Sequence, residues 1–172
     1  TVLLLLTLVR TDLLDVWQQT LDESAPNQFM INIQPQERES IASIYTSYGL
    51  DAPEFVPMVR ARMTYINGED VNEREYPIED GEWMAKREQN LSWAESIAPT
   101  NKLMEGEWWP EDYSGPPLVS LEQEAALELG VTMGDVLAYN VAGQTVEATV
   151  ANTREVNWDS FQPNFFMVFS PN

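Results

Sequence analysis

The chain has 172 residues, of which 44% are hydrophobic, and carries a formal net charge of −19 at pH 7. The hydrophobic content is enough for a folded core and excludes a disordered acidic tail. The charge argues against a nucleic-acid partner, because phosphate backbones are bound by Lys and Arg that displace counterions. With no cysteine and no histidine, disulfides, Cys/His zinc sites and Ser-His-Asp catalysis within this chain are excluded.

The N-terminal segment resembles the end of a longer apolar helix. Residues 1–9 are almost all apolar, but they are too few to span a bilayer, which needs ~20 residues. They also lack the basic region and cleavage site of a signal peptide. After Arg10 the pattern becomes amphipathic. We therefore predict a truncated membrane-helix end and a stalk helix over residues 1–24; an N-terminal helix packed on its own domain is the alternative.

Residues 25–68 predict a β-α-β unit. Strict alternation from Gln28 to Gln34 is typical of a half-buried strand. Apolar residues at helical spacing follow from Ile41 to Tyr48, and Gly49 would end that helix. Alternation returns from Met58 to Ile66. The side chains predicted on the apolar face of this second strand are Val59, Ala61, Met63 and Tyr65.

The range 69–154 is predicted as an inserted β-rich subdomain. Asn67-Gly68, a pair typical of a hairpin turn, precedes it. Residues 69–81 are acidic and loop-like, whereas Glu88 to Trp93 predict a strand. Ser120 and Gln123 fit the capping box of a short helix.

Gly130 would end that short helix, and a hairpin is predicted after it. Its two strands are predicted from Val136 to Val141 and from Thr145 to Val150, around Ala142-Gly143.

Residues 155–172 predict a return strand to the first subdomain. The run from Asn164 to Phe169 is apolar and opened by Pro163, which is typical of a strand buried on both faces. Such a strand needs neighbours, and we expect residues 25–66 to supply them. The turn with Trp158, Phe161 and Phe165 is expected to fix the subdomains together.

Few residues suggest a site. The chain has no nucleotide-binding or serine-hydrolase motif, and a catalytic carboxylate pair would need a cleft that sequence does not show. Trp108 and Trp109, together with Trp83 and Trp93, could form a sugar-stacking platform or an apolar ligand groove, or else cover the core of a small β unit. Arg60 and Arg62 share one strand face, where they either pair with surface carboxylates or meet a partner.

Eight short segments occur in a fixed order along the chain and carry a resemblance to a known family. They are Leu8 to Leu14, Asn27 to Pro35, Pro57 to Arg62, Asn90 to Trp93, Gly106 to Trp109, Leu129-Gly130, Gly134-Asp135 and Arg154 to Phe166. Together they resemble the FtsX-like (MacB-type) permeases of ABC transporters. Within these permeases the set is most similar to the predicted permease subgroup with two extracytoplasmic domains, encoded beside its ATPase and often near a periplasmic thioesterase or lysophospholipase. The chain resembles the second of those domains.

The chain departs from the family pattern in two respects. Ala61 stands where the subgroup usually has Gly between the two arginines, a mild change on the apolar face. The family also continues beyond the position of Asn172 with a further strand and helix. The layer is therefore expected to be incomplete here, with a strand edge open to pairing with a second copy.

The resemblance implies an α+β fold in which a porter-like β-α-β layer is interrupted by a smaller β-rich subdomain and preceded by a membrane-proximal stalk helix. It implies a periplasmic location at the bacterial inner membrane and a mechanical role, with no cofactor and no catalysis in this domain. The implied partners are a cytoplasmic ABC ATPase, a periplasmic esterase or thioesterase, and a hydrophobic or lipid-like substrate. Arg10, Asp12 and Trp17 are candidates for transmitting motion from the membrane.

Two other hypotheses remain open at this point. A stand-alone secreted binding module would hold a sugar or peptide on its Trp-rich surface and lose it in Trp108→Ala and Trp109→Ala. An enzyme would lose turnover with one carboxylate substitution.

Overall fold

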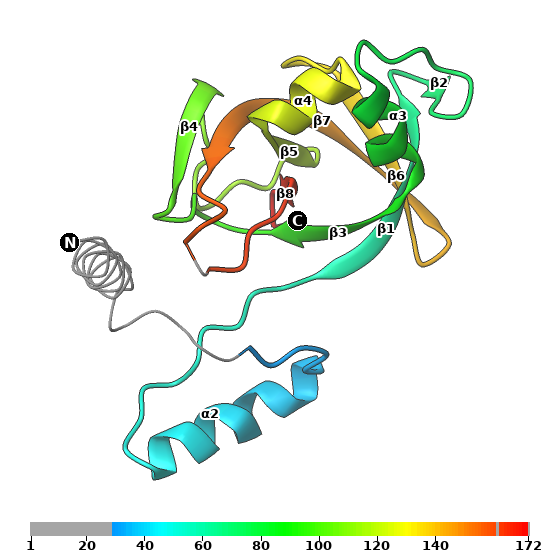
Figure 1. Cartoon of the computed structure of the whole chain (residues 1–172). Coiled ribbons are helices and arrows are strands. Elements are labelled where there is room, and N and C mark those ends of the chain that lie inside the picture. Colours follow the sequence, from blue (N-terminus) through cyan, green and yellow to red (C-terminus); the bar gives the residue numbers. More distant parts are fainter. Residues whose placement is uncertain (1–28, 161, 172) are drawn as a thin grey trace, which may run out of the picture. The chain divides into compact units, whose positions relative to one another are not determined.

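The computed structural model describes residues 29–160 and 162–171 (Figure 1). The predicted membrane-helix end and stalk of residues 1–24, with Arg10, Asp12 and Trp17, lie outside the described residues, as does Phe161. The chain divides into two compact units, Thr1–Glu37 and Arg38–Asn172. Among the described residues, no helix is both long and apolar enough to cross a membrane.

The described part of the first unit contains one short helical turn, η1 (Pro35–Glu37). The strand predicted from Gln28 to Gln34 is wrong for residues 29–34, which form none. Asn32 has a φ of 62°, in the left-handed region, which interrupts extended backbone. Phe29 is exposed rather than half-buried.

The helix predicted from Ile41 to Tyr48 is confirmed as α2 (Arg38–Ser47). Gly49 ends it with a φ of 72°, and the backbone N–H of Gly49 donates to the carbonyl of Thr46 at 3.0 Å. No residue of α2 is buried.

Six strands of the second unit close into a small barrel (Figure 1). The pairs β3–β8 and β5–β7 are parallel and the other four are antiparallel. Two further strands lie outside this circuit: β2 (Glu69–Asp70) pairs with β1, and β4 (Asn101–Gly106) pairs with β7. In circular order the barrel consists of β1 (Val59–Ile66), β3 (Glu88–Trp93), β8 (Met167–Phe169), β5 (Leu118–Glu122), β7 (Gln144–Val156) and β6 (Val136–Val141).

Strand β1 confirms the predicted strand but not its whole apolar face. Ala61 and Met63 are buried as predicted. The register with β6 then shifts by one residue after Met63, which turns Tyr65 outward with 44% of its surface exposed and buries Ile66 completely. Asn67-Gly68 forms the predicted turn, with positive φ at both residues.

The hairpin β6–β7 is also confirmed, with positive φ at Ala142 and Gly143. Strand β7 is longer than predicted, because its second half crosses to pair with β4 and β5. This length brings Arg154 to the end of the barrel opposite the hairpin turn.

Helix α4 (Gln123–Leu129) is present, but the predicted capping box is wrong. Ser120 lies inside β5 and is completely buried. The N-cap is Glu122, whose carboxylate accepts from the backbone N–H groups of Glu124 and Ala125. Gly130 ends the helix as predicted, with a φ of 64°.

Helix α3 (Glu79–Lys86) lies in the range that was predicted to be partly loop. It packs beside α4 (Figure 1), and Gly81 is the point of closest approach between the two helices. Its side chains Met84 and Ala85 are buried in the barrel core.

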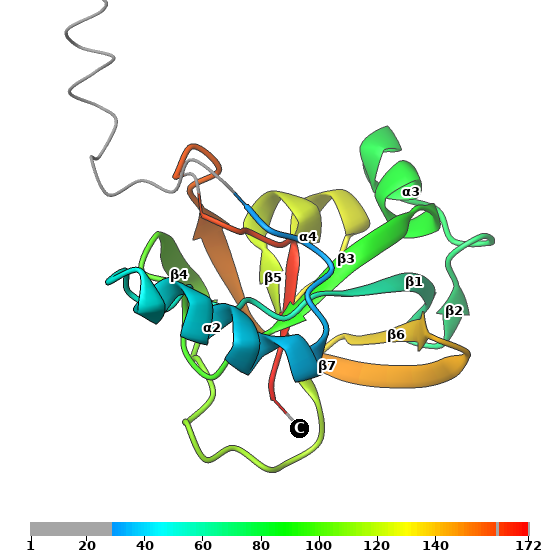
Figure 2. The same ribbon diagram turned by 90° about the horizontal axis from the view of Figure 1, so that it is seen from below.

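Strand β8 lies between β3 and β5 (Figure 2). The expectation that residues 25–66 flank it is therefore wrong. It is also shorter than predicted. The carbonyl of Phe166 still accepts from the backbone N–H of Glu122, the last residue of β5, but the carbonyl of Phe165 accepts from the side chain of Arg154 and not from a strand. The sheet thus includes strands from all three ranges 25–68, 69–154 and 155–172, while the porter-like layer stays a prediction.

Candidate functional site

Arg60 and Arg62 point outward from β1, on the face opposite the core. Arg60 forms an ion pair of 3.8 Å with Glu88 on the neighbouring strand, and both side chains are more than half exposed. An exposed pair at this distance contributes little to stability. The two arginines therefore lie on a solvated strand face, and their role at a partner interface stays a prediction.

Trp108 and Trp109 follow β4 and are held by the backbone that follows β3. The indole N–H of Trp108 donates to the carbonyl of Glu95, and that of Trp109 to the carbonyl of Ala94, each at 2.9 Å. The two rings lie 4.1 Å apart, and only 4% of the Trp109 surface is exposed. Trp109 thus covers the core, the second of the two interpretations of this pair, and offers no free face to a ligand.

A different group of aromatic residues does face solvent. A groove of about 550 Å³ runs between α3, α4 and the turn that precedes β8. Of the tryptophans that the sequence suggested for a ligand surface, Trp83 lines this groove, whereas Trp93, Trp108 and Trp109 do not. Its walls are Asp80, Trp83, Met84, Arg87, Glu122, Glu124, Ala125, Glu128, Trp158 and Phe166.

Arg87 is the centre of the groove. Its guanidinium lies 4.0 Å from the ring centre of Trp83 and 5.5 Å from that of Phe166. Both distances are in the range of cation–π interactions. Trp158 in turn packs on Phe166 with ring centres 4.8 Å apart. This stack joins helix α3 to the C-terminal turn.

The residues that line the groove include more carboxylates than cations. Partial burial raises the pKa of Glu128, and the charges of Asp80, Glu122 and Glu124 raise it further, whereas Arg87 alone lowers it. Since three carboxylates and one arginine act on Glu128, the charges around it favour a positive group. Glu122 contributes charge but no free oxygen, since its carboxylate caps α4.

The turn that carries Trp158 is fixed by a buried arginine. Arg154, completely buried, donates from Nη1 to the carbonyl and hydroxyl oxygens of Ser120 at 2.8 and 3.1 Å, and from Nη2 to the carbonyl of Phe165. Burial lowers the pKa of Arg154 to about 10, which leaves it charged at neutral pH. Asn164 closes the turn by donating to the carbonyl of Asn157 at 3.1 Å.

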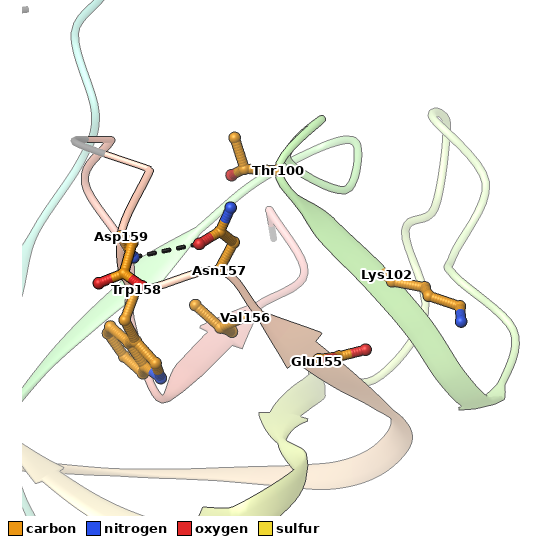
Figure 3. Close-up of a pocket in the computed structure, with 7 residues that line it drawn as sticks. All are labelled: Thr100, Lys102, Glu155, Val156, Asn157, Trp158 and Asp159. Atoms are coloured by element: carbon orange, nitrogen blue, oxygen red, sulfur yellow. Dashed lines mark hydrogen bonds between the residues drawn. The ribbon is translucent and has the colours of Figure 1, made fainter. Parts of the chain in front are cut away.

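A second pocket, of about 420 Å³, lies on the other side of Trp158 (Figure 3). Lys102 and Glu155, neighbours on paired strands β4 and β7, lie at one end of it. Asn157 accepts from the backbone N–H of Asp159 at 3.1 Å, and the indole of Trp158 points away from Lys102 and Glu155. Trp158 is the one residue that lines both pockets.

In residues 29–160 and 162–171, no three carboxylates are grouped so that they could hold a metal ion. The walls of the groove offer aromatic faces and charged groups to a binding partner.

A comparison with known proteins finds that the chain is similar to part of an ABC transporter permease. The chain is 35% identical over 168 residues to the uncharacterized ABC transporter permease YbbP of Escherichia coli (strain K12). This chain resembles one segment of an ABC permease. The match covers 97% of the chain and 20% of YbbP, so the chain spans about a fifth of that relative. No family model matches the chain, and no solved structure matches it.

Sequence reasoning missed the groove for a definite reason. Arg87 and Phe166 are far apart in the chain, and nothing in either neighbourhood indicates that they stack. The available signals were the exposed tryptophan Trp83 itself and the four-residue spacing between Trp83, in α3, and Arg87, which caps the C-terminal end of that helix.

Proposed function

We propose that this chain is an extracytoplasmic domain of an ABC transporter permease of the FtsX-like (MacB-type) group, on the periplasmic side of the bacterial inner membrane. The similarity to YbbP carries the proposal, since it extends over 97% of the chain at 35% identity. That the same match covers only 20% of YbbP supports a role as one domain of a larger protein.

In this role the domain is mechanical. A cytoplasmic ATPase partner closes on ATP and moves the membrane helices, and the domain passes the movement on to a hydrophobic or lipid-like substrate during export or extraction. Arg10, Asp12 and Trp17 remain candidates for the connection to the membrane. An esterase or thioesterase in the periplasm is a further proposed acceptor. The barrel suits a mechanical role, because hydrogen bonds from Arg154 on β7 connect this strand to Ser120 on β5 and to Phe165 in the C-terminal turn.

The location is tested by cysteine labelling of the full-length permease. This chain has no cysteine, so a single cysteine introduced into it reports on its position once any cysteines in the rest of the permease have been replaced. Arg60→Cys, on an exposed strand face, should react with a membrane-impermeant maleimide in intact cells whose outer membrane has been permeabilised. Ala61→Cys, the neighbouring core position, is the matched control and should stay unlabelled in the folded protein. Labelling of Arg60→Cys only after cell lysis would contradict the proposed location.

A further inference from the structure

We propose that the groove between α3, α4 and the turn before β8 is a docking site for a basic segment of a partner protein, one that presents a Lys or Arg side chain beside an apolar residue. This inference is independent of the permease role, since it rests only on the residues that line the groove.

The apolar part of the site is made of two exposed tryptophans. Trp83 has 61% of its surface exposed and Trp158 has 48%. Trp is the residue type most enriched among those that dominate protein–protein binding energy. The two indoles come from separate elements but are joined by the stack through Arg87 and Phe166, so their positions are fixed before a partner arrives.

Charge complementarity selects a basic occupant. Four carboxylates, Asp80, Glu122, Glu124 and Glu128, face one cation, Arg87, in the lining of the groove. Arg87 is itself engaged with two aromatic rings. The chain as a whole carries a net charge of −19, so a positive segment is attracted from a distance as well as at contact.

The groove already contains the interaction that an incoming cation would make. The guanidinium of Arg87 lies over Trp83 at 4.0 Å, which shows that an indole in this setting accepts a cation on its face. Among the described residues, no cation lies over Trp158, although about half of its surface is exposed and its ring packs on Phe166 at a tilted angle. An arginine or lysine of the partner would stack on Trp158 and face Glu128.

A protein segment fits the groove better than a small molecule or a lipid surface. Small-molecule sites bury most of their ligand, whereas here the main aromatic walls protrude into solvent. An anionic lipid surface would be repelled by the same carboxylates. The volume of about 550 Å³ accommodates one long side chain and its neighbour from a passing chain.

The test is a nuclear magnetic resonance titration of the 172-residue chain with short capped peptides. The probe contains two arginines and two leucines; one comparison peptide replaces the arginines with glutamates and another replaces the leucines with serines. We expect the arginine–leucine peptide to shift the indole N–H signals of Trp83 and Trp158 saturably, and not that of Trp93, an exposed tryptophan on β3. The glutamate peptide should shift neither.

Variants then place the binding in the groove. Trp158→Ala should weaken the affinity for the arginine–leucine peptide about tenfold or more, and Glu124→Gln with Glu128→Gln should weaken it severalfold. Trp93→Ala and Glu147→Gln, exposed positions outside the groove, are the matched controls and should leave it unchanged. The spectrum of each variant also reports whether it is folded.

Three results would overturn the proposal: no saturable shift with the arginine–leucine peptide, equal binding of the glutamate peptide, or binding that survives Trp158→Ala in a folded protein. If the serine peptide binds as well as the leucine peptide, charge alone attracts it, and the groove is not a docking site of the kind proposed.

Discussion

The α-carbon of Gly81 in helix α3 lies directly against the backbone carbonyl of Glu128 in helix α4. A β-carbon at this position would overlap that carbonyl oxygen, which is backbone and cannot move aside alone. The two helices therefore approach as closely as they do because position 81 has no side chain. The same contact aligns Trp83 and Glu128 along one groove.

Gly81→Ala should destabilise the domain, although alanine is the better helix former. In an isolated helix this change gains about 0.5–1 kcal/mol. Here the overlap with Glu128 forces α3 away from α4, and we expect a net loss of about 1–3 kcal/mol in the free energy of unfolding. Urea unfolding measures it. Glu124→Ala, on the exposed face of α4, should change stability by less than about 0.5 kcal/mol. A Gly81→Ala protein as stable as the wild type would show that the close contact between Gly81 and the Glu128 carbonyl does not limit the distance between the helices.

Arg154→Met should cost about 2–4 kcal/mol in the free energy of unfolding, because the buried carbonyl of Ser120 and the partly buried carbonyl of Phe165 lose their donors. Amide hydrogen exchange should quicken most in the turn that carries Trp158. Arg60→Met, which removes an exposed arginine with one long ion pair, is the matched control and should stay within about 0.5 kcal/mol of the wild type. Equal losses in the two variants would contradict the role of Arg154 as a tether.

Glu128→Gln should stabilise the domain at neutral pH and leave it unchanged in acid. The folded-state pKa of Glu128 is raised above the ordinary value of 4.5, so the folded protein holds this proton more tightly than the unfolded chain. The contribution of the group to stability is therefore full below pH 4.5 and is lost as pH rises through the raised pKa. Urea unfolding of both proteins across this range should show the difference growing with pH. A difference that instead grows toward low pH would contradict the crowding of carboxylates around Glu128.

Trp109→Phe should reduce the free energy of unfolding by about 1–3 kcal/mol, because the partly buried carbonyl of Ala94 loses the donor that the buried indole supplies. Thermal or urea unfolding checks the value. Trp93→Phe, which changes an exposed indole, should have an effect below about 0.5 kcal/mol. If Trp109→Phe were neutral, the ring would not be the core support described for it.

The sequence predicted those elements whose signals are local. Strand β3 was predicted with the bounds that it has, and the hairpin β6–β7 followed from alternation around Ala142-Gly143. Helix α3 was missed because its first turn carries three acidic residues and Gly81, a composition typical of a loop. That glycine serves helix packing, which is a property of the partner helix and not of the local sequence.

The other differences between the sequence predictions and the structure also arise from contacts between residues that are far apart in the chain. Ser120 fits a capping box, but it is buried in β5 beside Arg154, and Glu122 takes the capping role. The groove depends on pairs such as Arg87 and Phe166 that only the closed barrel brings together. Patterns of period 2 or 3.6 carry no information about such pairs. The resemblance to a permease, in contrast, depends on many short segments along the chain and needed no knowledge of their packing.

The central claim, that this domain couples ATP hydrolysis to movement of a hydrophobic substrate, is tested most directly in proteoliposomes. The full-length permease and its ATPase would be compared with a variant in which residues 29–172 are replaced by a flexible linker. We predict that the variant still assembles with the ATPase and hydrolyses ATP, but no longer releases a fluorescent lipid analogue from the membrane in an ATP-dependent way. Release at the wild-type rate without this domain would contradict the account.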